Sequence, residues 1–380
     1  MNKTTFNSTI ISRIIIFSCI IIHFMFFSDF KLFTWTFTHW DASYYLGIAQ
    51  YWYPTLLHPN WAFLPLFPCV LRIIFLITHS LFLTEIFGLL INSCTFILSS
   101  YVLYQLTKSL NKDIKNNALF AIFFPTTVFC SLIYTESLFL LFYLLTFLFF
   151  LHEKYEKSLL SSFLASLTRA NGILLSPLYL YAKKPIKTRT LMAFIPFLPF
   201  LLFNLYGYYL TGLFPITEIS RMTFWPDNHP TTMHDKIHHT LYSLYIIFAK
   251  IFLFAFVEPP NNLYIILVHL YLFIFTTLTF VSPLKSIRKI HLKNVLTFSF
   301  KTSEEAVLTY NISLLYFSSI LYLVYGNPYS LIRYLLPPTL IIMAAQKPLE
   351  RKLFTLLLTI EIIFLGLLTI IYLDGQIFIG

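Results

Sequence analysis

The sequence predicts an all-α, polytopic membrane protein, and three observations support this fold class. Hydrophobic residues make up 58% of the 380 positions and charged residues only 11%, whereas a soluble domain has about 25% charged residues. Apolar runs long enough to cross a bilayer core of about 30 Å as helices recur from one end of the chain to the other. They are unbroken stretches of Leu, Ile and Phe, unlike the alternating segments of about 10 residues that form membrane β-barrels. We therefore expect a transmembrane helical bundle.

The bundle is expected to contain about 10 to 12 spans or re-entrant segments in one integral domain, residues 1–380. The first apolar run leads into further spans and lacks a small-residue cleavage site, so we expect a retained span and no signal peptide. The run 159–181 is either one span or a short hairpin that turns at 169–172. The expected spans are residues 10–28, 62–80, 83–107, 118–133, 137–151, 159–181, 190–211, 241–257, 262–282, 306–325, 330–346 and 353–373.

Clusters of Lys and Arg between the spans predict which loops face the cytoplasm, because positive charge is retained on that side. Residues 183–189, 285–301 and 347–352 form such clusters. The net charge of +10 is divided among them and forms no continuous basic face, so we expect no nucleic-acid partner. Three lysines do not fit a strict alternation of sides: Lys108, Lys112 and Lys115.

Two loops are expected on the opposite side of the membrane, at residues 29–60 and 213–240. In the first, aromatic residues from Tyr44 to Trp52 are spaced as in a short helix whose aromatic side lies at headgroup level. The second is rich in polar and aromatic residues. Its histidines at 234 and 238 are one helical turn apart, which permits metal binding, although a solvated loop face is the simpler interpretation.

Asp41 is the first candidate for chemistry, because it places a carboxylate beside the first span in the stretch His39-Trp40-Asp41-Ala42-Ser43-Tyr44-Tyr45-Leu46. An acid at that depth is costly unless it is paired or serves a function. A structural alternative is that Asp41 caps the following helix by accepting backbone N–H bonds. Pro65 and Pro68 are expected to disrupt a helix that begins at the same surface, which favours a cavity there.

Four further polar residues lie within or at the ends of predicted spans, where such residues usually face a bundle interior or a wet cavity. Glu136 begins an apolar run and is equally well explained as a first-turn carboxylate favoured by the helix dipole. Arg169, near Asn171, needs a carboxylate or phosphate partner, and a structural pair with Glu136 is one solution. Arg333 can offer two donors to a phosphate or extend to the membrane interface. With 9 glycines and no phosphate-cradling loop, nucleotide-driven reactions lose support.

Four segments in this order resemble the PIG-V family, the second mannosyltransferases of glycosylphosphatidylinositol (GPI) anchor assembly, within the glycosyltransferase C class. They are His39 to Ala49, Trp61 to Pro68 in Trp-Ala-Phe-Leu-Pro-Leu-Phe-Pro, Tyr134-Thr135-Glu136-Ser137-Leu138-Phe139, and Arg169-Ala170-Asn171-Gly172; Arg333-Tyr334-Leu335 is a weaker match. The resemblance covers most of the chain. It implies a bundle of glycosyltransferase C type in the endoplasmic reticulum membrane, with 29–60 and 213–240 as luminal loops.

The resemblance also implies an activity: transfer of mannose from dolichyl-phosphate mannose to a GPI precursor that already bears one mannose, forming an α1,6 linkage with inversion. The expected partners are therefore this donor, the glycolipid acceptor and membrane lipid, and a small membrane partner subunit is compatible with them. No cofactor is required, since arginine can neutralise a monophosphate leaving group, although the class includes members that use a divalent metal. No metal-binding residue is assigned. The short outer loop 213–240 departs from the family pattern, which makes the donor assignment firmer than that of the acceptor.

In this scheme Asp41 is the general base that accepts the proton of the acceptor hydroxyl. Arg333 or Arg169 stabilises the departing donor phosphate, and the sequence does not choose between them. The predicted substrate contacts are His39, Trp40, Tyr44, Tyr45, Glu136 and Asn171. For the aromatic residues among them, anchoring at the membrane interface is nearly as good an explanation.

Three other functions remain open from the sequence. The chain can be another membrane glycosyltransferase that uses a polyprenyl-phosphate sugar. It can be a lipid or solute transporter in which Glu136 and Arg169 line a path, although the sequence shows no inverted repeat. It can also be a noncatalytic scaffold, which would tolerate substitution of Asp41 and Arg333.

Overall fold

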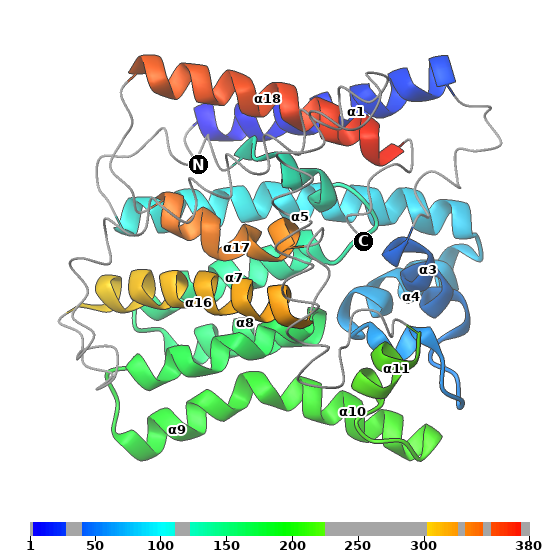
Figure 1. Ribbon diagram of the computed structural model, residues 1–380, viewed down its shortest axis with the longest axis vertical. Coiled ribbons are helices and arrows are strands. Elements are labelled where there is room, and N and C mark those ends of the chain that lie inside the picture. Colours follow the sequence, from blue (N-terminus) through cyan, green and yellow to red (C-terminus); the bar gives the residue numbers. More distant parts are fainter. Residues whose placement is uncertain are drawn as a thin grey trace.

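The computed structural model describes residues 3–27, 40–110, 122–224, 302–325, 331–344 and 351–373. Every regular element in these ranges is helical, as the sequence predicts (Figure 1). The α-helices are α1 (Lys3–Phe27), α3 (Asp41–Tyr51), α4 (Leu66–Thr78), α5 (Leu81–Leu110), α7 (Glu136–Leu151), α8 (Tyr155–Thr168), α9 (Ile186–Phe194), α10 (Leu198–Thr211), α11 (Ile216–Phe224), α16 (Ser303–Tyr325), α17 (Leu331–Ala344) and α18 (Arg351–Leu373). The 3₁₀ segments are η2 (Pro59–Ala62), η3 (Pro125–Cys130), η4 (Ala170–Tyr181) and η5 (Ile195–Phe197).

The long helices lie roughly side by side, and the short helices α3, α4 and α11 gather at one end of them (Figure 1). Helices α1 and α18 pack together along one edge, and α9 and α10 form the opposite edge. Between them, α5 packs on α7, and α7 packs on α8. Buried aromatic rings fill the interior, among them Phe96, Tyr134, Tyr143, Phe147 and Tyr179. The end that carries α3, α4 and α11 is called the α3 end below.

Helices α7 and α8 form an antiparallel pair joined by a turn at 152–154. The Ser158 hydroxyl donates to the Thr146 carbonyl at 2.9 Å, which fixes their register. The chain then reverses again after Thr168, and η4 returns along α8: Tyr179 contacts Ser162 at 2.8 Å. Residues 155–181 are therefore a hairpin, so the second of the two sequence interpretations is confirmed, and its turn begins at Arg169, as expected.

Gly172 permits this reversal, because a Cβ at this position would lie only 2.4 Å from the backbone Cα and N atoms of Ser166. Contact this close leaves no room for any side chain. Because residues 155–181 form a hairpin, the chain runs along the bundle once more between Lys108 and Lys183 than a single span would allow. Lys108 and Lys183 therefore lie at the same end of the bundle. That extra crossing removes the conflict that Lys108 posed for a strict alternation of sides.

The predicted span 118–133 does not form a long helix in its described part, residues 122–133, and the sequence prediction was wrong on this point. Only the short η3 segment is regular, and residues 131–135 are turns and bends. The buried Arg13 of α1 supplies hydrogen-bond donors to this irregular segment. It donates to the Thr127 carbonyl (2.9 Å), the Thr127 hydroxyl (3.0 Å) and the Ser131 hydroxyl (2.6 Å). Its guanidinium also lies 4.0 Å from the centre of the Phe96 ring.

The predicted span 62–80 is also corrected, because α4 has 13 residues and is therefore about 20 Å long, too short for a bilayer core of about 30 Å. Pro65 occupies its N-cap position and Pro68 its first turn, where the missing N–H of proline costs little. The two prolines therefore mark the start of α4 and do not disrupt it. Helix α4 leaves Ile73 and Ile77 exposed on its outer side.

Three helical stretches in the described residues are long and apolar enough to cross a membrane, so the chain is a helical membrane protein: Thr5–Ile22, Leu81–Leu110 and Ile186–Thr211. The last joins α9, η5 and α10 into one stretch. The total of 10 to 12 spans stays a prediction, since the expected spans 241–257 and 262–282 lie outside the described residues.

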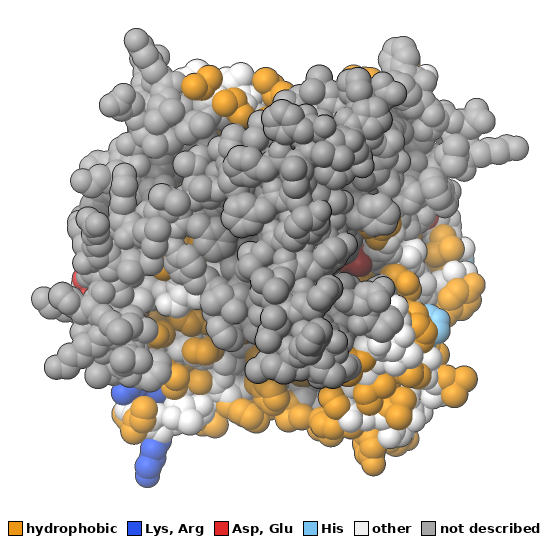
Figure 2. Space-filling model, viewed as in Figure 1, with side chains coloured by type: hydrophobic (Ala, Val, Ile, Leu, Met, Phe, Trp, Pro, Cys, Tyr) orange, Lys and Arg blue, Asp and Glu red, His pale blue; other side chains and the backbone are white. Residues whose placement is uncertain are grey.

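Lysines occur at the end of the bundle opposite to α3. Lys183 pairs with Glu153 at 2.6 Å and Lys184 lies over the Tyr155 ring, which joins the α7–α8 turn to the segment before α9. By contrast, α3, η2, α4, α11 and the described loops beside them contain no lysine. Figure 2 shows blue side chains near the start of α9 and apolar surface over α10 and α11. By the bounds of the helices and turns that contain them, the lysines at this end are Lys108, Lys154, Lys157, Lys183, Lys184 and Lys187.

Candidate active site

Asp41 begins the 11-residue helix α3, which confirms the short helix expected between the first two spans. The N-cap position belongs to Trp40, so the interpretation of Asp41 as the N-cap residue was wrong. Asp41 is instead half-buried in the first turn, where the helix dipole favours a carboxylate. Trp40 has φ 59° and ψ −124°, a strained conformation for a residue with a side chain.

The buried side of α3 holds Asp41 in place. Tyr45 is 5% exposed and packs edge-on against Phe63 and Phe67, with ring centres 5.1 and 5.4 Å away. Tyr44 stacks on Phe63 at 5.0 Å and is partly buried. The expected aromatic side at headgroup level is therefore not formed by Tyr45, whose ring lies inside the protein. Among the α3 aromatics it is Tyr51, 76% exposed, that faces outward.

Glu136 and Arg169 lie at the α3 end because α7 and α8 are antiparallel. Glu136 is the first residue of α7, and Arg169 directly follows the last residue of α8. The Arg169 Nη1 atom lies 2.5 Å from Glu136 Oε1, with side-chain exposures of 12% and 4%. The ion pair that the sequence suggested is therefore present, and it is buried. Asn171 lies two residues further on, at the start of η4, and is partly exposed.

Thr135 connects this ion pair to α3. Its hydroxyl oxygen accepts a hydrogen bond from Arg169 Nη1 at 3.2 Å and lies 3.3 Å from the Tyr45 hydroxyl. Burial, the negative charge of Asp41 and that of Glu136 raise the pKa of Tyr45, so its hydroxyl stays neutral at physiological pH. Three of the four sequence segments, 39–49, 134–139 and 169–172, thus converge on one polar cluster. We call Asp41, Tyr45, Thr135, Glu136 and Arg169 the α3 cluster.

The fourth segment, Trp61 to Pro68, packs against the cluster through aromatic rings. Its residues Phe63 and Phe67 contact Tyr45, and Trp61 is fully buried between Tyr53 and Phe203. Gly207 of α10 lies against this aromatic group, since a Cβ there would approach Trp61 and Ile216.

Two predicted site residues cannot be placed with the cluster. His39 lies outside the described residues, and Arg333 is described only as a backbone position near the start of α17. The choice between Arg169 and Arg333 as the phosphate ligand therefore stays open, although the charge of Arg169 is already balanced by Glu136.

Two buried residues of this region were missed from the sequence. Thr135 directly precedes Glu136 in the segment 134–139, but a threonine next to a glutamate does not by itself indicate a functional residue. Asn92 is a polar residue inside the apolar α5; its side-chain amide donates to the carbonyls of Leu132 and, at 2.8 Å, of Tyr134. A polar residue within an apolar span is the signal that could have identified it.

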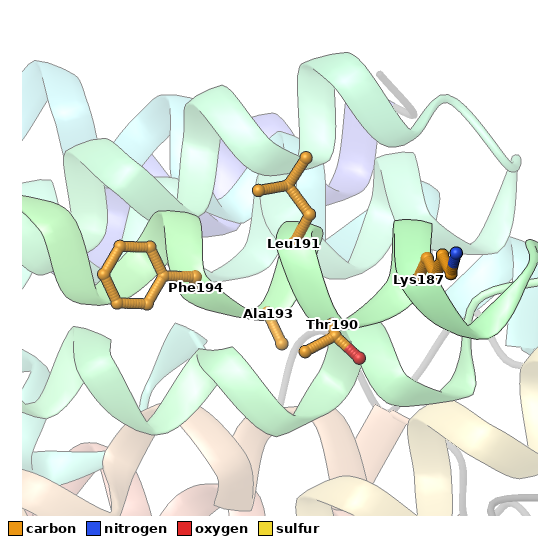
Figure 3. Close-up of a pocket in the computed structure, with 5 residues that line it drawn as sticks. All are labelled: Lys187, Thr190, Leu191, Ala193 and Phe194. Carbon is orange, nitrogen blue, oxygen red and sulfur yellow. The ribbon is translucent and has the colours of Figure 1, made fainter.

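Among the described residues, no group of three or more His, Cys, Asp or Glu side chains is arranged to hold a metal ion. The histidines at 234 and 238 lie outside the described residues, so the structure does not test whether they bind a metal. A surface depression of about 710 Å³ lies on α9, a helix that contributes no residue to the α3 cluster. Its lining comes from one helix and contains no predicted site residue (Figure 3): Lys187, Thr190, Leu191, Ala193 and Phe194.

Comparison with known proteins gives one partial relation. The chain is 33% identical over 138 residues to a protein of Schizosaccharomyces pombe named GPI mannosyltransferase 2. The match covers 35% of this chain and 29% of that protein, so the chain matches less than a third of its relative's length. No protein-family profile matches the chain, and no solved structure matches it. The relation supports a glycosyltransferase family without establishing which one.

Proposed function

We propose that this protein is a membrane glycosyltransferase that uses a polyprenyl-phosphate sugar, and specifically a mannosyltransferase of GPI-anchor assembly. The observation that carries the proposal is the convergence of three separated sequence segments on the α3 cluster, in which the helix that begins with the half-buried Asp41 is joined through Tyr45 and Thr135 to a buried ion pair. The partial identity to a protein named GPI mannosyltransferase 2 supports the sugar and the pathway. Dolichyl-phosphate mannose is the donor we propose, and the acceptor is a GPI precursor with one mannose.

The proposed reaction is a single displacement. The acceptor hydroxyl oxygen attacks the anomeric carbon of the donor, its proton passes to the Asp41 carboxylate, and the bond from that carbon to the phosphate oxygen breaks. Dolichyl phosphate leaves, and attack from the opposite side converts the β-linked donor into an α-linked product. General-base catalysis of this kind contributes about 10²- to 10⁴-fold to the rate.

The phosphate that leaves carries negative charge, which a positioned cation would stabilise. Arg169 is 2.5 Å from Glu136, and this ion pair reduces the net charge that Arg169 can offer to a second anion. We therefore favour Arg333 for the phosphate and assign Arg169 and Glu136 to the framework around Asp41. Trp40, Tyr44, His39 and Asn171 remain the proposed contacts with the sugar or headgroup.

We also propose that the α3 end faces the lumen of the endoplasmic reticulum. Six lysines lie at the opposite end of the bundle, whereas the described residues of the α3 end include no lysine and, apart from the buried ion pair, the two arginines Arg72 and Arg221. An excess of Lys and Arg marks the cytoplasmic side of membrane proteins. The reacting sugars would then meet in the lumen, while the lipid tails of donor and acceptor remain in the bilayer.

The test is transfer of labelled mannose by the purified protein in liposomes. Asp41→Asn should abolish transfer from dolichyl-phosphate mannose while yield and thermal unfolding stay unchanged. Glu153→Gln is the matched carboxylate-to-amide control, because Glu153 is exposed and lies at the other end of the bundle. Full activity of D41N would remove Asp41 as the base.

The donor and the acceptor need separate tests. Dolichyl-phosphate glucose, offered in parallel, should give no product; a preference for it would indicate another polyprenyl-phosphate-dependent transferase. Expression in cells that lack the second GPI mannosyltransferase should consume the accumulated one-mannose intermediate. Persistence of that glycolipid, despite good expression, would contradict the proposed acceptor.

A further inference from the structure

Thr135 occupies the N-cap position of α7, yet its side chain does not cap the helix. Threonine at this position usually bonds to a backbone N–H of the first turn. Here the hydroxyl is turned to two distant partners, Tyr45 on α3 at 3.3 Å and Arg169 after α8 at 3.2 Å. Thr135 is 0% exposed, so this is a bridge within the protein and not a contact with solvent or ligand.

The turn that carries Thr135 is itself held rigidly. Asn92 of α5 donates to the carbonyls of Leu132 and Tyr134, and its own backbone carbonyl accepts a bond from the Ser137 hydroxyl at 2.6 Å. Asn92, Ser137 and Thr135 are all fully buried. Bonds on both sides of residue 135 therefore fix the position of its hydroxyl relative to α5.

Through this hydroxyl, three elements that supply the α3 cluster are held together. Helix α3 carries Asp41 and is joined through Tyr45; Glu136 is the next residue in the chain; and Arg169 is bonded directly. Loss of the hydroxyl would leave the Arg169–Glu136 pair in place but would remove this bridge from Arg169 to Tyr45 of α3. The small displacement that follows is enough to reduce a rate that depends on the placement of Asp41.

We propose that Thr135 is a positioning residue, whose hydroxyl holds the Arg169–Glu136 pair in register with the helix that carries Asp41. The proposal rests on the proposed function for its effect on catalysis. Thr135 touches no reacting atom in this scheme. Its loss should therefore lower kcat while the KM for donor and acceptor changes little.

The first experiment compares three variants in the liposome assay. Thr135→Val keeps the shape and removes the hydroxyl, and its kcat should fall about tenfold or more, the equivalent of one buried hydrogen bond. Thr135→Ser restores the hydroxyl and should recover most of the rate. Thr146→Val is the matched control, because Thr146 of the same helix is equally buried and its hydroxyl bonds only within α7. A T135V enzyme with wild-type kcat would overturn the inference, as would equal losses in T135V and T146V.

The second experiment needs no enzymatic activity. A double-mutant cycle on thermal unfolding combines Tyr45→Phe with T135V, and Tyr45→Phe with T146V as the control. The first pair should be non-additive, since both changes remove the same bridge, and the second should be additive. Additivity in the first pair would overturn the bridge. If the wild-type protein transfers sugar from no polyprenyl-phosphate donor, the proposed function fails, whereas this cycle still decides whether the bridge exists.

Discussion

The buried ion pair between Glu136 and Arg169 predicts a large effect of a small substitution. Glu136→Gln leaves the size of the side chain unchanged and removes its charge, so that the guanidinium of Arg169, 12% exposed, loses the carboxylate 2.5 Å away. Removal of one partner from a buried pair costs about 3–5 kcal/mol. Because Arg169 keeps its bond to Thr135, we take the lower end, about 3 kcal/mol.

The assay is thermal unfolding of the detergent-solubilised protein. At the lower end of the range for larger chains, about 2 °C per kcal/mol, E136Q should lower Tm by about 6 °C. The control is Glu153→Gln, which breaks the Lys183–Glu153 pair. That pair has a similar separation of 2.6 Å, but its side chains are 57% and 47% exposed. Solvent screens such a pair, so its loss should leave Tm within experimental error.

A second comparison separates the ion pair from simple packing. The double variant Glu136→Leu with Arg169→Met replaces both charges by apolar groups and should be more stable than E136Q, since neither buried charge is then left alone. Equal Tm values for E136Q and E153Q would refute the reasoning. So would a double variant less stable than the single one.

The remaining predictions concern the hairpin and the orientation of the chain. Gly172→Ala places a Cβ 2.4 Å from the backbone of Ser166 and should destabilise the protein by about 1–3 kcal/mol or more. Gly47→Ala meets no atom within 4 Å and should stabilise α3 by about 0.5–1 kcal/mol. Tm measurements in detergent that rank the two variants in the opposite order would contradict the hairpin. Glycosylation sequons inserted beside the exposed Leu56 should be modified in cells, and those beside Lys154 should not. Glycans at the second position only would mean that the bundle is inverted.

The helical class and the α3 helix could be predicted because composition and spacing determine them. Spacing places Tyr45, Ile48 and Ala49 on one side of α3, and these three residues are buried. The pairing of Glu136 with Arg169 could also be predicted, because a buried guanidinium requires an anion and the chain offers few. The length of α4 could not, since an interfacial helix and the start of a span have the same apolar composition.

The irregular segment 122–135 shows a different limit of sequence analysis. Its apolar composition predicts a span, but Pro125 and the β-branched residues that follow it disfavour a regular helix. What makes the irregular path possible is Arg13, more than a hundred residues earlier. No local pattern connects these two positions, and the same applies to the bridge from Thr135 to Tyr45.

The dependence of this segment on Arg13 has a consequence for how the protein is made. A regular helix satisfies its own backbone in lipid as it leaves the translocon, but residues 127–131 take part of their hydrogen bonding from α1. We therefore expect the insertion of this segment into the bilayer to depend on α1. The first helix should stay next to the translocon until residues 127–131 have been synthesised.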